Sequence, residues 1–415
     1  MASATAKAAA PSLLLLPPPP QPSTRPALNA AYRAPLKAVL TRLKDELASN
    51  PGSTSVLVIA VTTPLLSGPV PKRKSLDWNT AQSLLASFYT LISAICTEVS
   101  IDTAGDGSVD ARVVLVDHQR KRSYEKNFDG VYEKNSTTVY DLASFATTVY
   151  PWKKVFHPST EAGYELLNAY LALAEGRQTI LQSQLVAVEG GLSLSTSTAS
   201  SPTKENSIAG YSTVCLGGTF DHLHPGHKLL LHAAVLLLAV PEANSKKQSV
   251  LIVGITGDEL LKNKKYAEEL QSWNFRAEQV LLFLSTIFNS PLSNTNTLPE
   301  TTSPSEDERH ATFRDGTVLV RLTIIRDPFG PPIAEEDVDV IAVSGETRSG
   351  GQAINDKRAE KGWTPLGVYE IDILDADGVM EDSVESTAAT ATDGFAAKIS
   401  STAIRQRKAL EKNKI

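Results

Sequence analysis

The sequence predicts an α/β fold in two domains, of which the second is a parallel sheet with helices on both faces. The chain has 415 residues and a hydrophobic content of 42%, enough for two domains that each bury their own core. A stretch rich in Ser, Thr and Gly at residues 190–212 separates the two halves. Beyond it, strands that are apolar throughout alternate with helices, which is typical of a parallel sheet covered on both sides.

The start of the chain is rich in Ala, Pro and Ser, and we interpret residues 1–27 as a disordered tail. The leucines at 13–16 are followed at once by the prolines at 17–20, so this run is far shorter than the ~20 apolar residues of a membrane span. Basic residues without any acid precede Asp45, as in mitochondrial presequences, but four prolines would break a presequence helix. A tail is therefore favoured, and mitochondrial association is the alternative.

The first domain is predicted over residues 28–189, followed by a linker at 190–212. Its expected helices and strands are a helix around Leu36, Leu40 and Leu43, a strand at 55–61, a helix at 80–95, a strand at 111–116 and a helix at 164–174. Its residues match no motif that indicates an activity, so we expect a structural or assembly role.

The second domain is predicted over residues 213–412. Two polar stretches, at 289–316 and 375–394, lack apolar periodicity and are interpreted as surface insertions. The remaining segments alternate as strand 213–216, helix 228–238, strand 250–256, helix 275–288, strands 318–325 and 338–344, helix 352–361, strand 367–373 and helix 400–412.

Residues 215–232 (CLGGTFDHLHPGHKLLLH) connect the first strand of this domain to its first helix. The carboxyl edge of a parallel sheet is where such folds bind ligands. Gly217 and Gly218 allow a sharp turn and a close approach of the backbone to a nucleotide. The helix that follows presents unpaired N–H groups to phosphate. The loop is therefore suited to anions.

His224 and His227 flank Pro225 and Gly226 at the start of that helix, with proline where a first helical residue would be. Four of the seven histidines lie between His222 and His232. A lone histidine would more often be an ordinary surface or core residue. Two imidazoles three residues apart at a helix start can instead face one ligand and donate hydrogen bonds to phosphate oxygens.

The segment GGTFDHLHPGH resembles the signature of the HxGH nucleotidyltransferase superfamily, whose domains are Rossmann-like. Further blocks resemble the eukaryotic phosphopantetheine adenylyltransferases, such as the adenylyltransferase part of coenzyme A synthase. These blocks are LLKNKK at 260–265, Arg276, VSGETRSGG at 343–351, Asn355, Arg358 and ISSTAIR at 399–405. The resemblance covers residues 213–412, about half of the chain.

This resemblance implies that ATP and 4′-phosphopantetheine, with Mg²⁺, give dephospho-coenzyme A and pyrophosphate in coenzyme A biosynthesis. It also suggests assembly with other enzymes of that pathway. Thr219 would then hold the substrate phosphate, His227 the α-phosphate and His224 the triphosphate. Gly217, Gly218, Phe220 and Asp221 would belong to the same nucleotide-binding loop. Such a transfer needs alignment and charge neutralisation, and neither a protein nucleophile nor a protein-bound metal is expected.

Basic residues and hydroxyls farther along complete the expected site. Lys262, taken as catalytic, and Lys264 would direct charge toward the pantetheine phosphate, although a solvated turn that includes Lys265 is the alternative. Arg348 would bind substrate. Phosphate is favoured for Arg358, and Arg276 is left open between a phosphate contact and a surface charge. Ser400, Ser401 and Thr402 would cap the last helix and bind ATP phosphates, with Arg405 one turn on.

Some residues depart from the family pattern. Gly345 stands where an acidic residue is expected, and Arg348 is shifted relative to the family's basic residue. These differences weaken the assignment of the pantetheine side more than that of the ATP side.

Composition narrows the class of protein further. The formal net charge is −6 and the pI is near 5.7, which argues against nucleic acid as a partner. Cys96 and Cys215 are far apart and have no metal-ligand spacing, so we expect a reducing, cytoplasmic location without disulfides or structural zinc.

Three alternatives remain beside the favoured assignment. One is another HxGH enzyme, such as a cytidylyltransferase or a nicotinamide mononucleotide adenylyltransferase. Another is a regulatory module that binds nucleotide without turnover. A class I aminoacyl-tRNA synthetase is disfavoured because no KMSKS-like loop is present.

Overall fold

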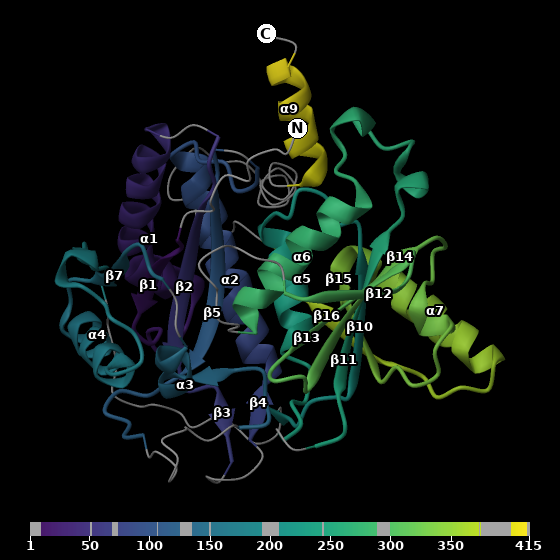
Figure 1. Cartoon of the computed structure of the whole chain (residues 1–415), viewed down its shortest axis with the longest axis horizontal. Helices are drawn as coiled ribbons and strands as arrows, with labels where there is room; N and C mark the ends of the chain where they lie inside the picture. Colours follow the sequence, from purple (N-terminus) through teal and green to yellow (C-terminus); the bar gives the residue numbers. More distant parts are fainter. Residues whose placement is uncertain are drawn as a thin grey trace.

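A computed structural model describes residues 10–49, 52–68, 74–105, 107–124, 135–148, 151–192, 207–242, 245–288, 299–372, 374 and 400–412. Each half of the chain forms its own large sheet, and the two halves lie side by side with helices between the sheets (Figure 1). The predicted α/β class is confirmed.

The first sheet has six parallel strands in the order β6-β5-β2-β1-β7-β8. Its strands are β1 (Ser12–Leu16), β2 (Ser55–Thr63), β5 (Val109–Asp117), β6 (Tyr140–Asp141), β7 (Val155–Pro158) and β8 (Leu185–Val188). Its helices are α1 (Arg25–Ala48), α2 (Trp78–Glu98), α3 (Leu142–Thr147), α4 (Glu161–Ala174) and the short η1 (Gln182–Gln184). Helix α1 packs beside α2, and α3 beside α4.

The expected disordered tail is wrong for the described part of residues 1–27. Strand β1 lies inside the first sheet, paired with β2 on one side and β7 on the other. All four of its leucines are fully buried. The prolines at 17–20 do not interrupt this strand, because they follow its last paired residue, Leu16. Helix α1 then begins at Arg25, with the hydroxyl of Thr24 accepting a hydrogen bond from the N–H of Ala27.

The second sheet has seven strands in the order β12-β13-β14-β11-β10-β15-β16. The five from β14 to β16 are parallel, as predicted, and β12 and β13 are antiparallel. The strands are β10 (Thr213–Gly218), β11 (Ser249–Thr256), β12 (Thr301–Ser305), β13 (Glu308–Phe313), β14 (Val318–Ile325), β15 (Val340–Ser344) and β16 (Gly367–Ile371).

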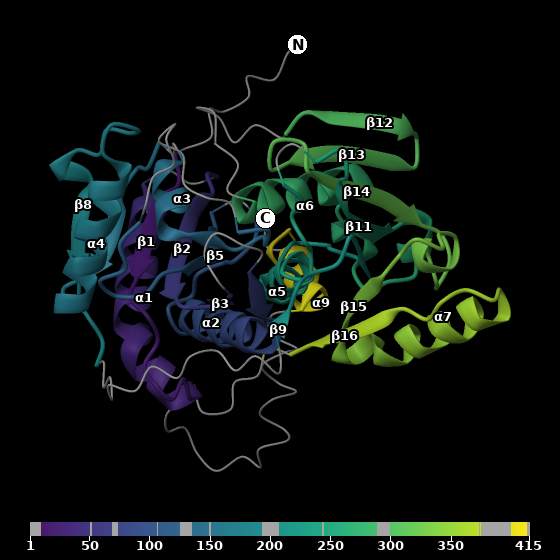
Figure 2. The ribbon, with the colours of Figure 1, turned by 90° about the horizontal axis from the view of Figure 1, so that it is seen from below.

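Helices α5 (Pro225–Val235) and α6 (Trp273–Ile287) lie on the side of this sheet that faces the first half, and α7 (Arg348–Glu360) lies on the other side (Figure 2). Helix α9 (Ser401–Lys412) follows near the end of the chain. The short helices are η3 (Asp258–Leu261), η4 (Ala267–Glu269), η5 (Pro331–Ile333) and η6 (Gly345–Thr347).

The two predicted insertions have different outcomes. Part of the first predicted surface insertion, 289–316, has regular structure, because β12 and β13 extend the sheet beyond β14. Strand β12 is exposed along its whole length, so it lacks the apolar pattern that would have predicted it. The second insertion, 375–394, lies outside the described residues. Much of the linker does as well, but its residues Ser207–Ile208 form β9, which joins β3 (Leu66–Ser67) and β4 (Ser75–Asp77) in a small antiparallel sheet.

Both halves share one strand order. With β6 set aside, the first sheet reads β5-β2-β1-β7-β8 and the parallel part of the second reads β14-β11-β10-β15-β16. Each places its third, second, first, fourth and fifth parallel strands in that spatial order, which is the Rossmann-like arrangement. In such sheets the binding crevice lies where the order reverses, between the first and fourth strands.

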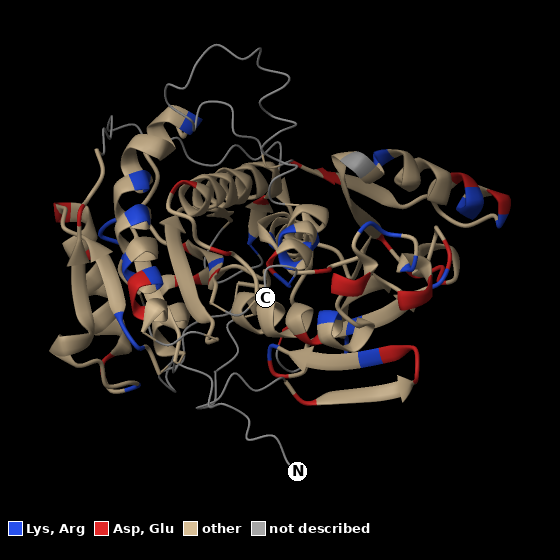
Figure 3. Cartoon of the chain, turned by 90° about the horizontal axis from the view of Figure 1, so that it is seen from above, with Lys and Arg blue, Asp and Glu red and all other residues tan. Residues whose placement is uncertain are grey.

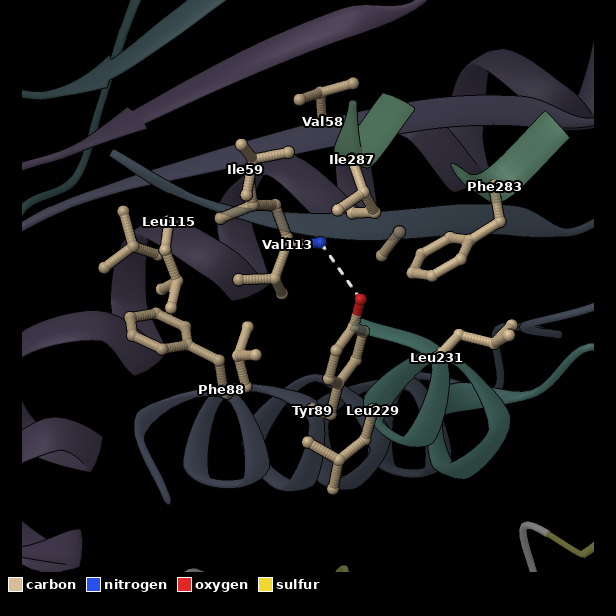
Figure 4. Close-up of a cluster of buried hydrophobic side chains, with 14 of the residues drawn as sticks. Val58, Ile59, Phe88, Tyr89, Val113, Leu115, Leu229, Leu231, Phe283 and Ile287 are labelled. Carbon is tan, nitrogen blue, oxygen red and sulfur yellow. Dashed lines mark hydrogen bonds between the residues drawn. The ribbon is translucent and has the colours of Figure 1, made fainter. Parts of the chain in front are cut away.

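The two halves do not have separate cores, contrary to the prediction. Figure 4 shows one buried cluster in which Tyr89 of α2 lies beside Leu229 of α5, and which also contains Phe88 of α2 and Leu231 of α5. The indole N–H of Trp78 donates to the carbonyl of Ala233 at 2.9 Å. Helix α2 is the one described helix that is long and apolar enough to cross a membrane, and 78% of its most apolar window is buried in the protein. Its apolarity serves the junction between the halves.

The shared core predicts one cooperative unfolding transition for the whole chain. Leu231 is fully buried at the junction, so Leu231→Ala should cost about 2–5 kcal/mol and shift the entire transition to lower temperature. Scanning calorimetry of both proteins measures this. Two separated transitions, of which only one moves in the variant, would contradict a single core.

Candidate active site

A cavity of about 510 Å³ opens at the carboxyl edge of the second sheet. Its walls come from the ends of β10, β15 and β16 and from the first turns of α5 and α9. It therefore lies beside β10 and β15, the first and fourth parallel strands, where the strand order predicts a ligand site.

The loop after β10 turns in a different way from the one predicted. Gly217 and Gly218 are still extended strand residues, and the left-handed positions are Phe220 (φ 51°) and His222 (φ 47°). A Cβ on Gly218 would stand 3.0 Å from the ring of Phe220. That ring is fully buried and packs against His227, with 5.4 Å between ring centroids. Gly218 thus makes room for the side chain that supports His227.

His224 and His227 come together at the start of α5. Their rings stack with centroids 3.8 Å apart and planes 24° from parallel, and both line the cavity. The Nδ1 atom of each ring is buried and has no partner among the described residues. A Cβ on Gly226 would stand 3.2 Å from the His224 ring, so a larger residue between the two histidines would press on that ring.

The first turn of α5 is open to an anion. His224 is its N-cap residue, but its side chain makes no capping hydrogen bond, and Pro225 follows within the first turn. The amides of such a turn and the positive end of the helix dipole favour a negatively charged ligand.

Both imidazoles are neutral in the free protein. Burial, followed by the nearby charge of Lys228, lowers the pKa of His224 to about 3. Burial holds the pKa of His227 well below its ordinary value, and a proton on His224 would lower it further. A neutral imidazole still has one N–H to donate. A phosphate at the site would favour the protonated form and raise both pKa values.

A buried network fixes the loop that carries these histidines. Arg276 is fully buried, and it donates to the carbonyls of Thr219 (2.6 Å) and Thr256 (2.8 Å) and to the carboxylate of Asp258 (2.6 Å). It is therefore neither a surface charge nor a residue of the cavity wall. Asp221, also fully buried, pairs with Arg405 at 2.6 Å.

Phe220 and Asp221, which we expected to contact nucleotide, are instead internal supports of the loop. The Ser401 hydroxyl donates to the carbonyl of Asp221 at 2.8 Å, which ties α9 to the same loop.

Several other predicted residues do line the cavity. They are Gly217, Gly218, Thr219, Lys264, Ser400, Ser401, Thr402 and Arg405. Ser400 also caps α9, since its hydroxyl accepts from the N–H of Ala403 at 3.3 Å. Among the three lysines of this turn, Lys262, Lys264 and Lys265, only Lys264 lines the cavity. Lys262 is exposed and lies outside the cavity wall.

The expectation for Arg358 is wrong. It is 1% exposed, and its guanidinium donates to the carbonyls of Thr364, Pro332, Glu335 and Glu336. It therefore holds the loop before β15 against α7. Arg348 pairs with Glu370 at the surface and is not in the cavity wall, so its assignment to substrate has no support from the geometry.

The sequence reasoning missed part of the wall. Asp372 follows β16 at the carboxyl edge, and Leu229, Leu230, Ile371 and Leu374 form an apolar side. The position of Asp372 near the carboxyl end of the predicted strand 367–373 was the available signal. Leu229 and Leu230 had none, because leucines on a helix next to a histidine are expected to be core.

Comparisons with known proteins agree with this division of the chain. A cytidylyltransferase-like family matches residues 215–407. Residues 1–194 match a family described as a domain of unknown function, DUF8446.

Three relatives illustrate the likeness. An uncharacterized protein of Schizosaccharomyces pombe, C1F12.08, is 34% identical over 46% of this chain and 46% of its own length. A phosphopantetheine adenylyltransferase of Saccharomyces cerevisiae is 32% identical over 47% of this chain and 48% of its own. One from Thermococcus kodakarensis is 28% identical over 40% of this chain and 76% of its own. The matched region thus spans about half the length of the two fungal relatives.

A solved structure of a protein with unknown function from Archaeoglobus fulgidus is also similar in sequence, at 22% identity over 42% of this chain and 95% of that chain. Its TM-score is 0.26, so it adds nothing to the argument about the fold.

Charges of both signs are interspersed over both domains in the view of Figure 3. This distribution differs from the one-sided basic face of many nucleic-acid-binding proteins. The exclusion of nucleic acid as a partner stays a prediction.

The buried imidazoles of α5 predict how stability depends on pH. Burial lowers the pKa of His232 to about 3, against about 6.5 in an unfolded chain. The unfolded state therefore binds the extra proton first, and stability present above about pH 6.5 is lost as the pH falls toward 3. Between about pH 7.5 and 5, wild type should lose about 2 kcal/mol more than His232→Gln in urea unfolding. Equal losses would show that His232 is not buried as a neutral ring.

Proposed function

We propose that the second domain transfers the adenylyl group of ATP to 4′-phosphopantetheine and releases pyrophosphate. The observation that carries this proposal is the stacked pair His224 and His227, which lines the cavity at the open first turn of α5 and whose Nδ1 atoms have no hydrogen-bond partner among the described residues. Polar ring atoms and the amides of a helix's first turn are costly to leave unsatisfied. A polyphosphate is the ligand that would satisfy them.

The second substrate is argued from the wall and from the relatives. Lys264 supplies a cation for a phosphate, while Leu229, Leu230 and Leu374 offer apolar surface beside it. A molecule with a phosphate at one end and an alkyl-amide arm fits such a mixed wall. The names of the yeast and archaeal relatives support phosphopantetheine as that molecule.

The reaction needs alignment more than covalent help from the protein. A phosphate oxygen of 4′-phosphopantetheine forms a bond to the α-phosphorus of ATP. The bond from that phosphorus to the α,β-bridging oxygen breaks, and its electron pair leaves with pyrophosphate. Thr219 would hold the attacking phosphate, His227 the α-phosphate, and His224 the departing phosphates. Donors fixed in advance lower the barrier because they need no reorganisation as charge develops.

Magnesium would enter with ATP. No group of three or more His, Cys, Asp and Glu side chains with the geometry of a metal site occurs among the described residues. We therefore expect the ion to be held chiefly by phosphate oxygens and water, which is the usual mode for Mg²⁺. When bound, the ion would supply charge neutralisation to the phosphates. A cytoplasmic location and assembly with other coenzyme A enzymes stay predictions.

A coupled assay of pyrophosphate release with ATP, Mg²⁺ and 4′-phosphopantetheine tests the proposal. Wild type should turn over, and His227→Ala should lower kcat by about 100-fold or more, because one phosphate donor is lost in the transition state. His310→Ala, which changes a histidine of β13 far from the cavity wall, should keep the wild-type rate.

Replacing ATP by CTP separates this proposal from a cytidylyltransferase. Binding of ATP without any release of pyrophosphate would instead indicate a regulatory module. Near wild-type turnover by His227→Ala would contradict the role given to the histidine pair.

A further inference from the structure

Helix α5 has a second charged contact directly behind its histidines. Lys228 follows His227 in sequence, yet it points away from the cavity into the first domain and is only 2% exposed. Its ammonium donates to the carboxylate of Asp110 at 2.6 Å and to the carbonyl of Ala111 at 3.1 Å. Both acceptors belong to β5 of the first sheet.

Asp110 connects this contact to a second helix of the site domain. Its other oxygen accepts from Arg112 at 2.6 and 2.9 Å, and Arg112 donates onward to the carbonyl of Leu282 (2.8 Å) and the hydroxyl of Thr286 (2.6 Å) in α6. Burial alone would raise the pKa of Asp110, but the charges of Arg112 and Lys228 hold it below its ordinary value. The carboxylate is therefore ionised and anchors α5 and α6 together.

The first domain also contacts two other elements of the cavity wall, the end of β16 and helix α9. The Ser83 hydroxyl donates to the carboxylate of Asp372 at 2.7 Å, and the side chain of Gln82 accepts from the Asp372 amide at 3.1 Å. Asp102 pairs with Arg407 of α9 at 2.9 Å. Three elements of the cavity wall thus have a polar contact with the first domain. They are α5, the end of β16 and α9.

The first domain has no comparable phosphate cradle at its own corresponding loop. The counterpart of the histidine loop, residues 17–24 after β1, begins with prolines at 17–20, which have no backbone N–H to donate, and the hydroxyl of Thr24 already accepts from the N–H of Ala27 in the first turn of α1. The carbonyl of Pro17 is taken by the hydroxyl of Tyr32 at 2.7 Å. The shared strand order thus comes without the groups that would bind a nucleotide at that position.

We propose that the first domain positions helix α5 for nucleotidyl transfer, and that Asp110, acting through Lys228, is the positioning residue. This inference rests on the proposed function for its kinetic readout. A buried ion pair is by itself weak support for stability, because desolvation offsets the attraction between the charges. Its effect here is geometric: it fixes the rotation and height of the turn that carries His224 and His227, and displacement of such groups by about 1 Å can cost up to 100-fold in rate.

The decisive variant is Asp110→Asn, with Asp117→Asn as the matched control. Asp117 is also buried on β5, pairs with Arg122 at 2.7 Å, and accepts from the amides of Leu65 and Leu66, all within the first domain. At matched folded concentration, Asp110→Asn should lower kcat about 10- to 100-fold with less than about a threefold change in KM for ATP. Asp117→Asn should keep kcat even where it lowers the unfolding temperature.

A double variant separates positioning from folding. Asp110→Asn with Lys228→Met removes the unpaired lysine charge but leaves Arg112 without its carboxylate, so it should recover part of the lost stability. It does not restore the anchor, so kcat should stay low. Recovery of both stability and kcat would overturn the proposal, as would wild-type kcat in Asp110→Asn.

Hydrogen exchange supplies a readout that needs no turnover. Amides of the peptide covering residues 223–236 should exchange faster in Asp110→Asn than in wild type, and at the wild-type rate in Asp117→Asn. Unchanged exchange in Asp110→Asn would overturn the positioning role. Failure of wild type to release pyrophosphate would instead refute the proposed function, while the exchange comparison would still decide this inference.

Discussion

The ion pair between Lys228 and Asp110 lies at the boundary of the two domains, one residue behind the imidazole of His227. Helix α5 therefore presents its first turn to the cavity and its next side chain to the first sheet. Its apolar side chains join the core shared with α2 (Figure 4). One helix of 11 residues thus has its orientation set by the first domain and its chemistry used by the second. This arrangement explains why the two domains occur in one chain: contacts from the first orient a helix that the second uses in its cavity.

The proposed transfer depends on two imidazoles that are neutral because the protein surrounds them. Their stacking at 3.8 Å would be unfavourable if both rings were charged, and burial keeps them uncharged. A triphosphate would change that balance, since its negative charge compensates a proton on either ring. The buried supports of the loop, Arg276 and the Asp221–Arg405 pair, keep the rings in place before any ligand arrives. Such preorganisation is what transfer without a protein nucleophile requires.

Much of the second domain could be predicted from the sequence, because its parallel strands are apolar throughout and its histidine loop is a local pattern. The remainder depends on partners distant along the chain. The leucines of β1 form a strand only because β2 and β7 lie on either side of them. Arg358 resembles a phosphate ligand until the carbonyls around it are placed. Strand β12 has no apolar pattern, since it is an exposed edge. The proposed role of Asp110 could not be predicted either, because it depends on how the two domains pack against each other.

The most direct test of the central claim is an NMR titration of the histidine ring nitrogens with a non-hydrolysable ATP analogue and Mg²⁺. The ring resonances of His224 and His227 should shift as the analogue binds, and those of at least one ring toward protonated imidazole, because phosphate charge raises their pKa values. Those of His310, on β13, should stay where they are. Saturable binding that leaves the resonances of both His224 and His227 unchanged would show that the triphosphate lies elsewhere, and the account of the site would be wrong.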